Sequence, residues 1–187
     1  MLLSDRTIIE LIRKGELIIE PFDEKLVGPS SVDLRLGNDF IMFDRKRIEA
    51  IDPRKPVDDY LEYIHVNDGD FLVLHPGQFV IASTLEYIKL PSYISARIEG
   101  RSSLARLGLI IHSTGGFVDA GFEGTLTLEM SNINIVPIKL YPKMKIAQLA
   151  FILQDKPSLV PYNKRETSKY LAQKGPTPSR IHLDFDQ

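Results

Sequence analysis

Residues 101–130 read RSSLARLGLIIHSTGGFVDAGFEGTLTLEM and contain the strand that most clearly indicates the fold. Within residues 125–131, Leu126, Leu128 and Met130 alternate with polar side chains. Such alternation is typical of a β-strand with one buried face, because successive side chains point to opposite sides of the sheet. A glycine-rich turn and an Arg-Ser-Ser segment come before this strand, so the stretch combines structure with candidate chemistry.

Similar short apolar runs continue in both directions, separated by turn-forming residues such as Asp68-Gly69-Asp70 and His75-Pro76-Gly77. Runs rich in Ile, Val, Leu and Phe between such breaks predict strands. The expected strands cover residues 31–36, 39–43, 71–74, 79–84, 94–99, 124–130, 138–140 and 147–153. We therefore predict a mainly β fold, which can be a sandwich, a jelly roll or a distorted barrel.

The two ends of the chain differ from this β pattern. A short helix is predicted over residues 4–14, with Ser4 as its N-cap and Gly15 as the residue that ends it. Its apolar stripe consists of Ile8, Leu11 and Ile12. From residue 163 the chain turns polar, so 163–187 is predicted to be a mobile C-terminal segment that can order when an anion binds.

At 187 residues the chain is long enough to bury one hydrophobic core, and we predict a single domain, 1–187. A hydrophobic content of 43% and a charged content of 26% are typical of a soluble globular protein. No apolar run reaches the length of a membrane span, and no basic region precedes an apolar core at the N-terminus. We expect a cytoplasmic protein that does not contact a membrane.

The composition also limits the chemistry. The chain has no cysteine, which excludes disulfides and thiolate metal sites. Its four histidines show no metal-binding spacing, so no resident metal is expected. The formal net charge of −2 argues against a general nucleic-acid binder, because such proteins usually need a basic face.

Glu129 is the first candidate for chemistry. On the alternating strand it shares a face with Thr125, Thr127 and Ser131. That face is either the solvated side of the sheet or the wall of a polar pocket in which Glu129 acts as a general base. The strand pattern alone favours the solvated side.

Asp119 lies among the glycines of the turn and has two interpretations of equal weight. It is either a turn aspartate, which is the commonest use of Asp near Gly, or a carboxylate that holds a water or a ribose hydroxyl where glycines permit close approach.

The segment before the turn contains donors for anionic oxygens. Arg101 and Arg106 can bind phosphate oxygens through paired hydrogen bonds, and Ser102 and Ser103 add hydroxyl donors. Alternatively, one of the serines caps a helix and the arginines lie in solvent. A helix start also binds anions, so the two interpretations are compatible.

The whole chain resembles the dCTP deaminases of the trimeric dUTPase superfamily. The matching segments are PSSVDLRLG at 29–37, RSSLARLG at 101–108, HSTGGFVDAGFEG at 112–124, LTLEM at 126–130, KIAQLAF at 145–151 and YNKRETSKYLAQKGPTPSR at 162–180. They cover the chain from end to end in the family's order.

The resemblance implies a distorted β-barrel or jelly roll of the dUTPase-like type, and a homotrimer whose active sites are shared between neighbouring subunits. It implies hydrolysis of dCTP to dUTP and ammonia in pyrimidine deoxynucleotide biosynthesis, with Mg2+ bound to the triphosphate and no zinc. Zinc-dependent cytidine deaminases hold their metal through cysteine, which this chain lacks.

The resemblance also implies roles for individual residues. The glutamate matched by Glu129 acts as general base, and the positions matched by Ser102 and Arg106 help orient the water and the base. Asp119 matches the aspartate near the sugar. The remaining substrate-binding positions are matched by Arg101, Ser103, Thr127, Gln148, Tyr162, Lys169 and Gln173, and the last four of these match residues that hold the triphosphate.

Release of dUTP as the final product is our main hypothesis from the sequence. The alternative is a bifunctional enzyme that also cleaves dUTP to dUMP and diphosphate. Residues 112–124 and the KGPTPSR tail are more similar to bifunctional members, although Gly115 replaces their usual alanine. A dUTPase without deaminase activity and a dNTP-binding regulator without catalysis are further alternatives. The joint presence of Glu129, Ser102, Arg106 and Asp119 argues against the regulator.

Overall fold

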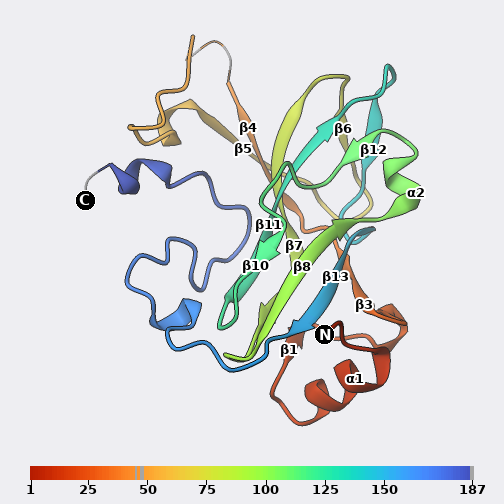
Figure 1. Cartoon of the computed structure of the whole chain (residues 1–187). Helices are drawn as coiled ribbons and strands as arrows, with labels where there is room; N and C mark the ends of the chain where they lie inside the picture. The colour runs from red at the N-terminus through yellow and green to blue at the C-terminus, as the bar shows by residue number, and fades with distance from the viewer. Residues whose placement is uncertain (45, 47–48, 186–187) are drawn as a thin grey trace.

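Two antiparallel β-sheets form most of the molecule (Figure 1), in a computed structural model that describes residues 1–44, 46 and 49–185. The last two residues of the predicted C-terminal segment, 186 and 187, lie outside the described residues. The larger sheet has the order β5-β4-β7-β11-β9, with β1 paired to β7, and the smaller sheet has the order β10-β8-β13-β3-β2. A further pair, β12-β6, stands apart. The mainly β prediction of a jelly-roll or barrel type is confirmed.

The bounds of the elements follow the apolar runs of the sequence. The larger sheet contains β1 (Ile18–Glu20), β4 (Asp39–Phe43), β5 (Leu61–His65), β7 (Phe79–Lys89), β9 (Leu109–Ile110) and β11 (Glu123–Asn132). The smaller sheet contains β2 (Val27–Gly28), β3 (Ser31–Arg35), β8 (Ile94–Gly100), β10 (Phe117–Val118) and β13 (Lys145–Leu153). The separate pair is β6 (Leu72–Leu74) and β12 (Ile138–Leu140). The helices are α1 (Asp5–Arg13) and α2 (Ser102–Ala105), with 3-10 turns η1 (Glu24–Leu26), η2 (Asp58–Tyr60), η3 (Tyr162–Lys164) and η4 (Ile181–Asp184).

The helix α1 confirms the predicted element at the N-terminus. Ile8 on its apolar stripe is fully buried, and Leu11 and Ile12 pack against the core. Gly15 follows the helix with φ +72°, a conformation that glycine adopts at little cost. Ser4 is the N-cap residue, as predicted, but its hydroxyl makes no capping bond and only its carbonyl accepts the N–H of Ile8.

The hydrophobic core combines the inward-facing side chains of both sheets. Phe40 on β4, Leu128 on β11 and Phe151 on β13 are all fully buried. Burying a side chain of this size contributes about 1.5–3 kcal/mol, so this shared core holds the two sheets together. No helix in the described part of the chain is long and apolar enough to span a bilayer.

The central strand β7 is longer than its predicted span of 79–84. It continues through Glu86, a carboxylate that is only 1% exposed. Arg35 on β3 satisfies this charge through Nε, 2.7 Å from Oε1, and through its backbone N–H, 2.8 Å from Oε2. Polar residues interrupt the apolar run in this half of the strand, so the sequence did not reveal it. In the structure Glu86 pairs with Arg35 of the smaller sheet and Lys89 pairs with Glu123 on β11.

An irregularity in β11 lies where the strand approaches the C-terminal segment. The register of β11 against β7 shifts between Thr125 and Thr127. At this shift the N–H of Leu126 donates to the side-chain hydroxyl of Thr84 on β7, at 2.9 Å. Such bulges re-aim side chains and are frequent beside functional sites.

The C-terminal segment packs across the edge of β11, drawn in blue in Figure 1. Gln173 forms a parallel bridge with Gly124, and the N–H of Ala172 donates to the carbonyl of Glu123 at 2.8 Å. Earlier in the segment, the N–H of Tyr162 donates to the carbonyl of Ala120 at 2.8 Å. The segment is therefore ordered against the sheets, and its mobility remains a prediction.

Candidate active site

A cavity of about 640 Å³ lies beneath the C-terminal segment and is lined by strands of both sheets. Pockets of this size are typical of small-molecule sites. Its walls come from β4, β7, β8, β10 and β11, and the C-terminal segment covers it. The lining residues are Phe43, Ile51, Phe79, Ile81, Ile98, Gly115, Phe117, Val118, Asp119, Phe122, Leu126, Thr127, Glu129, Tyr162, Tyr170, Gln173, Thr177, Pro178 and Ser179.

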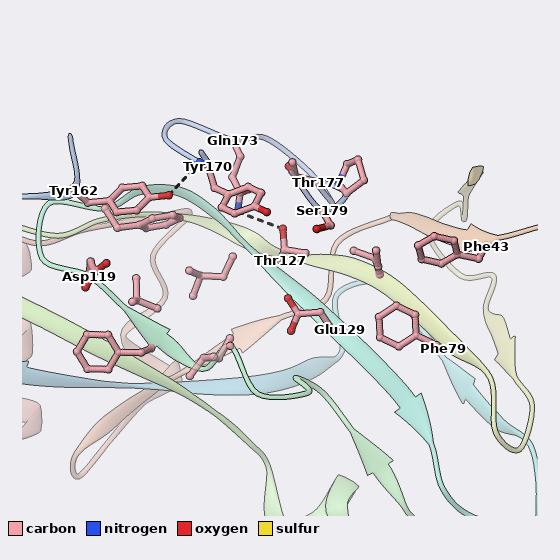
Figure 2. Close-up of a pocket in the computed structure, with 18 of the residues that line it drawn as sticks. Phe43, Phe79, Asp119, Thr127, Glu129, Tyr162, Tyr170, Gln173, Thr177 and Ser179 are labelled. Carbon is pink, nitrogen blue, oxygen red and sulfur yellow. Dashed lines mark hydrogen bonds between the residues drawn. The ribbon is translucent and has the colours of Figure 1, made fainter. Parts of the chain in front are cut away.

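Glu129 lies on the polar face of β11, and this face forms a wall of the cavity. Its neighbours Leu128 and Met130 point the other way and are fully buried, as the alternation predicts. Figure 2 shows the carboxylate between one end of the cavity, with Asp119, and the other end, with Phe79. The half-buried face is therefore a pocket wall, and the expectation of a solvated face is wrong.

The environment of Glu129 suits a general base. Burial raises the pKa of its carboxyl above the ordinary value of 4.5, because the charged form loses hydration. The backbone N–H groups of Ser113 and of Glu129 itself, together with nearby His112, pull this pKa in the opposite direction. A carboxylate with a raised pKa is a stronger base and can still be ionised near neutral pH.

Asp119 is exposed at the opposite end of the cavity, in the turn after β10. The turn is closed by a bond from the N–H of Phe122 to the carbonyl of Asp119 at 3.1 Å. Gly121 has φ +82°, and a Cβ there would lie 2.6 Å from the Cβ of Pro161. Asp119 is therefore a turn residue whose carboxylate also faces the cavity, and its contact with a water or a ribose hydroxyl remains a prediction.

Aromatic side chains line the same end of the cavity as Asp119. Phe122 and Tyr162 have ring centroids 5.8 Å apart, and Phe117 lies on β10 along the same wall. This end of the cavity thus combines one carboxylate with flat apolar surfaces, which suits a sugar beside a planar ring.

Gln173 reaches the cavity from the C-terminal segment. Its Nε2 donates to the carbonyl of Thr125 at 2.7 Å and to the hydroxyl of Thr127 at 3.3 Å, as the dashed line in Figure 2 marks for Thr127. The Oε1 atom is buried and has no hydrogen-bond partner among the described residues. A ligand donor such as a hydroxyl or an amine can satisfy that atom, whereas a phosphate oxygen cannot. The role of Gln173 in holding the triphosphate remains a prediction.

The donor segment lies outside the lining of this cavity. Ser102 and Ser103 are exposed on α2, and Arg106 follows them, also exposed. Neither serine caps the helix, because Arg101 occupies the N-cap position and no side chain makes a capping bond. The structure therefore does not bring these predicted residues together with Glu129 inside one chain.

Arg101 and Gln148 belong to a second polar cluster on the outer face of the smaller sheet. Asp33 accepts from Arg101 at 3.3 Å and from Lys145 at 3.1 Å. Gln148 lies opposite Asp33 in the pairing of β13 with β3, and opposite Glu99 in the pairing with β8. This cluster offers cationic and amide donors to an anion.

Lys169 is also outside the cavity lining. Its ammonium forms an ion pair with Asp184, and its side chain is 19% exposed. Of the predicted substrate-binding and catalytic residues, the cavity brings together Asp119, Thr127, Glu129, Tyr162 and Gln173.

Several lining residues were not predicted. Tyr170, Thr177 and Ser179 come from the same C-terminal segment as Gln173. They carry no local signal, since polar and aromatic residues in a tail do not reveal which strand it will cover. Within residues 1–44, 46 and 49–185, no group of three or more His, Asp or Glu side chains could hold a metal ion.

The chain matches the family model described as dCTP deaminase-like over residues 2–153. A protein of Corynebacterium glutamicum (strain R), described as "dCTP deaminase, dUMP-forming", is 50% identical over 186 residues, which cover 99% of this chain and 98% of that protein. A protein of the same description from Dictyoglomus thermophilum is 48% identical over 188 residues, covering 99% of this chain and 97% of that protein.

A solved structure shows a similar fold. The crystal structure of 2'-deoxycytidine 5'-triphosphate deaminase from Agrobacterium tumefaciens matches with a TM-score of 0.64 and 26% identity. The match covers 80% of this chain and 45% of that chain.

Proposed function

This chain belongs to the dCTP deaminase-like family, and from that premise we propose that it hydrolyses dCTP to ammonia and dUMP, releasing diphosphate. The proposal adopts the bifunctional alternative in place of dUTP release, our main hypothesis from the sequence. Relatives about half identical over 99% of the chain are described as dUMP-forming, and this observation carries the choice. Deamination converts dCTP and water to dUTP and ammonia, and a second water then cleaves dUTP to dUMP and diphosphate. We place the reaction in the cytoplasm.

Glu129 is the proposed general base for deamination. It accepts a proton from a water molecule, and that water attacks C4 of the cytosine ring. The carboxyl returns this proton to the ring nitrogen N3. It then takes the proton of the new C4 hydroxyl and delivers it to the amine, so the C4 carbonyl forms, the C4–N4 bond breaks and ammonia leaves. The raised pKa of Glu129 supports both steps, because the group has to accept and release a proton near neutral pH.

The other lining residues hold the nucleoside. Asp119 accepts from a sugar hydroxyl, while Phe122 and Tyr162 pack against the sugar and the base. The unpaired Oε1 of Gln173 accepts from a donor on the nucleoside, and Thr127 keeps the amide in place. These contacts leave the triphosphate to other groups.

The triphosphate and the attacking water need donors that this cavity lacks. We propose that a neighbouring chain supplies them in a homotrimer, through Ser102, Ser103 and Arg106 on its exposed α2 and through Arg101 and Gln148 beside it. The exposure of α2 supports this arrangement, because a second chain can reach it. Lys169 adds a further cation once a phosphate replaces Asp184 as its partner.

In the proposed reaction, Mg2+ is bound to the triphosphate and is part of the substrate. The carboxylate nearest the proposed phosphate donors is Asp33, and both of its oxygens are engaged by Arg101 and Lys145. Because Asp33 is already paired, this group of residues fits an Mg2+ ion that arrives already bound to the triphosphate. When bound there, Mg2+ neutralises phosphate charge.

The products of dCTP hydrolysis test the proposal. Purified protein is incubated with dCTP and Mg2+, and ammonia, dUTP, dUMP and diphosphate are measured over time. We expect ammonia, dUMP and diphosphate in equal amounts, with little free dUTP. In the matched variant Glu129→Gln, ammonia release should fall by about 10²–10⁴-fold while dCTP binding persists.

Each other outcome contradicts a defined part of the proposal. Ammonia with dUTP alone would exclude the bifunctional reaction. Turnover of dUTP without any ammonia from dCTP would indicate a dUTPase, and tight binding of dCTP without turnover would indicate a regulator. Full activity of Glu129→Gln would remove this residue from the role of base.

A further inference from the structure

Arg180 follows the part of the C-terminal segment that covers the cavity and turns back onto its beginning. The covering residues Tyr170, Gln173 and 177–179 are called the cavity roof below. The Nη1 atom of Arg180 donates to the carbonyl of Lys169 at 2.5 Å. Its backbone N–H donates to the hydroxyl of Tyr170 at 3.0 Å, and its guanidinium carbon lies 6.0 Å from the centre of that ring.

The roof is thus attached at two places. Near its middle, the N–H of Thr125 donates to the carbonyl of Gln173 at 3.0 Å, and the Gln173 amide returns a bond to Thr125. At the start of the roof, Tyr170 is held by Arg180 on one side and through its own N–H by the hydroxyl of Tyr162 at 3.1 Å. Figure 2 shows Tyr170 and Ser179 on the same side of the cavity as Gln173.

A second set of contacts joins residue 169 to the last turn of the described chain. Lys169 forms an ion pair with Asp184, and the N–H of Leu183 donates to the carbonyl of Arg180 at 3.2 Å. The last turn of the described chain is therefore attached to residues 169–170 at its start, through Arg180, and at its end, through Asp184. The side-chain contacts of Arg180 involve one backbone carbonyl and one aromatic ring, so these two depend on its planar, multi-donor guanidinium.

We propose that Arg180 is a positioning residue that fixes Tyr170 over the cavity before the nucleotide binds. The inference rests on the proposed function, in which the nucleotide occupies this cavity. Arg180 itself does not line the cavity, and it acts through Tyr170 and the backbone of Lys169. A roof that is already ordered binds its ligand more tightly, because less conformational entropy is lost on binding.

Three variants test this role in the full-length protein. Arg180→Ala removes the guanidinium contacts with the Lys169 carbonyl and the Tyr170 ring but keeps the backbone bond to the Tyr170 hydroxyl. Arg180→Lys keeps the charge and one donor but loses the flat contact with Tyr170. Arg165→Ala is the matched control, because Arg165 is an exposed arginine of the same segment whose Nε contacts the nearby Thr167 at 2.8 Å. For each protein, amide hydrogen exchange of residues 169–173 is measured without ligand, and KM and kcat are measured with dCTP.

We expect Arg180→Ala to exchange the roof amides about tenfold faster and to raise KM about tenfold, with kcat within about twofold of wild type. Arg180→Lys should have exchange rates and a KM between those of Arg180→Ala and the wild type. Arg165→Ala should match the wild type in roof exchange. The melting temperature should stay unchanged, since Arg180 is exposed and remote from the core.

Unchanged roof exchange in Arg180→Ala would overturn the proposal. So would faster exchange with an unchanged KM, or a loss confined to kcat. Absence of dCTP turnover in the wild type would instead contradict the proposed function, and the exchange rates would still decide whether Arg180 anchors the roof.

Discussion

Glu129 combines burial with an ionisable group, and this combination has a cost in stability. In the unfolded chain its carboxyl ionises near 4.5, whereas burial raises the pKa in the folded protein. Below the ordinary pKa both states are protonated, and the group has no effect on stability. As the pH rises above it, the unfolded state loses its proton first, so the folded state becomes relatively less stable.

This linkage predicts that Glu129→Gln stabilises the protein at neutral and alkaline pH. Glutamine cannot ionise, so the variant avoids the loss that the wild type suffers above pH 4.5. Thermal unfolding of both proteins at pH 8 and at pH 4 measures the effect. The variant should melt higher at pH 8, and the difference should shrink at pH 4. A variant that melts lower at pH 8 would show that the carboxylate is stabilised in the fold.

At the residue scale, the sequence identified the right face of β11 but not its surroundings. The alternation of Leu126, Leu128 and Met130 predicted that Glu129 points away from the core, which the structure confirms. Whether that face meets solvent or a cavity depends on residues 40 positions later in the chain, which no local pattern encodes. The family resemblance supplied the role of Glu129, which remains a proposal.

At the scale of elements, the C-terminal segment completes the cavity. It covers β11 through backbone bonds such as the one from Thr125 to Gln173 at 3.0 Å. Gly124 permits this contact, because it has φ +142° and a Cβ there would lie 3.0 Å from the carbonyl oxygen of Gln173. The segment beyond Tyr162 contributes no side chain to the core cluster in the described part of the chain.

We therefore predict that deleting residues 163–187 weakens nucleotide binding but leaves the fold intact. The deletion is made in the Glu129→Gln background, so that binding of dCTP can be measured by calorimetry without turnover. Affinity should fall at least about tenfold relative to full-length Glu129→Gln, because the cavity roof and Lys169 are lost. The melting temperature reports whether the two sheets still pack. Equal affinity of the two proteins would show that the segment does not contact the nucleotide.

The elements themselves were partly predictable. Strands with a clear apolar run, such as β4 and β12, have the predicted bounds. Strands that are short or polar, such as β5 with its exposed residues and β10 with two residues, were missed. Their pairing comes from neighbouring strands and not from their own composition.

At the scale of the whole molecule, residues adjacent in sequence are separated in space. Ser102 and Arg106 stand close to the glycine-rich turn in the chain, and that closeness suggested one combined site. The structure places them on α2, outside the cavity that holds Glu129. Sequence distance could not reveal this separation, because the chain passes through α2 and β9 before it reaches the turn beside the cavity. A shared active site reconciles the two observations.

The shared site requires that Glu129 of one chain and Arg106 of a neighbour act together. Mixing Glu129→Gln with Arg106→Ala, two variants that should each be inactive, tests this requirement. After unfolding and joint refolding of equal amounts, ammonia release from dCTP is measured. In a random trimer, about a quarter of the sites combine an intact Glu129 with an intact Arg106, so about a quarter of wild-type activity should return.

The matched control is Glu129→Gln refolded with the double variant Glu129→Gln/Arg106→Ala, which contains no intact Glu129 and should stay inactive. Recovery of activity only in the first mixture is the result that the shared site predicts. Activity in the first mixture no greater than the sum of its two separate components would contradict it and would place both residues in the site of a single chain.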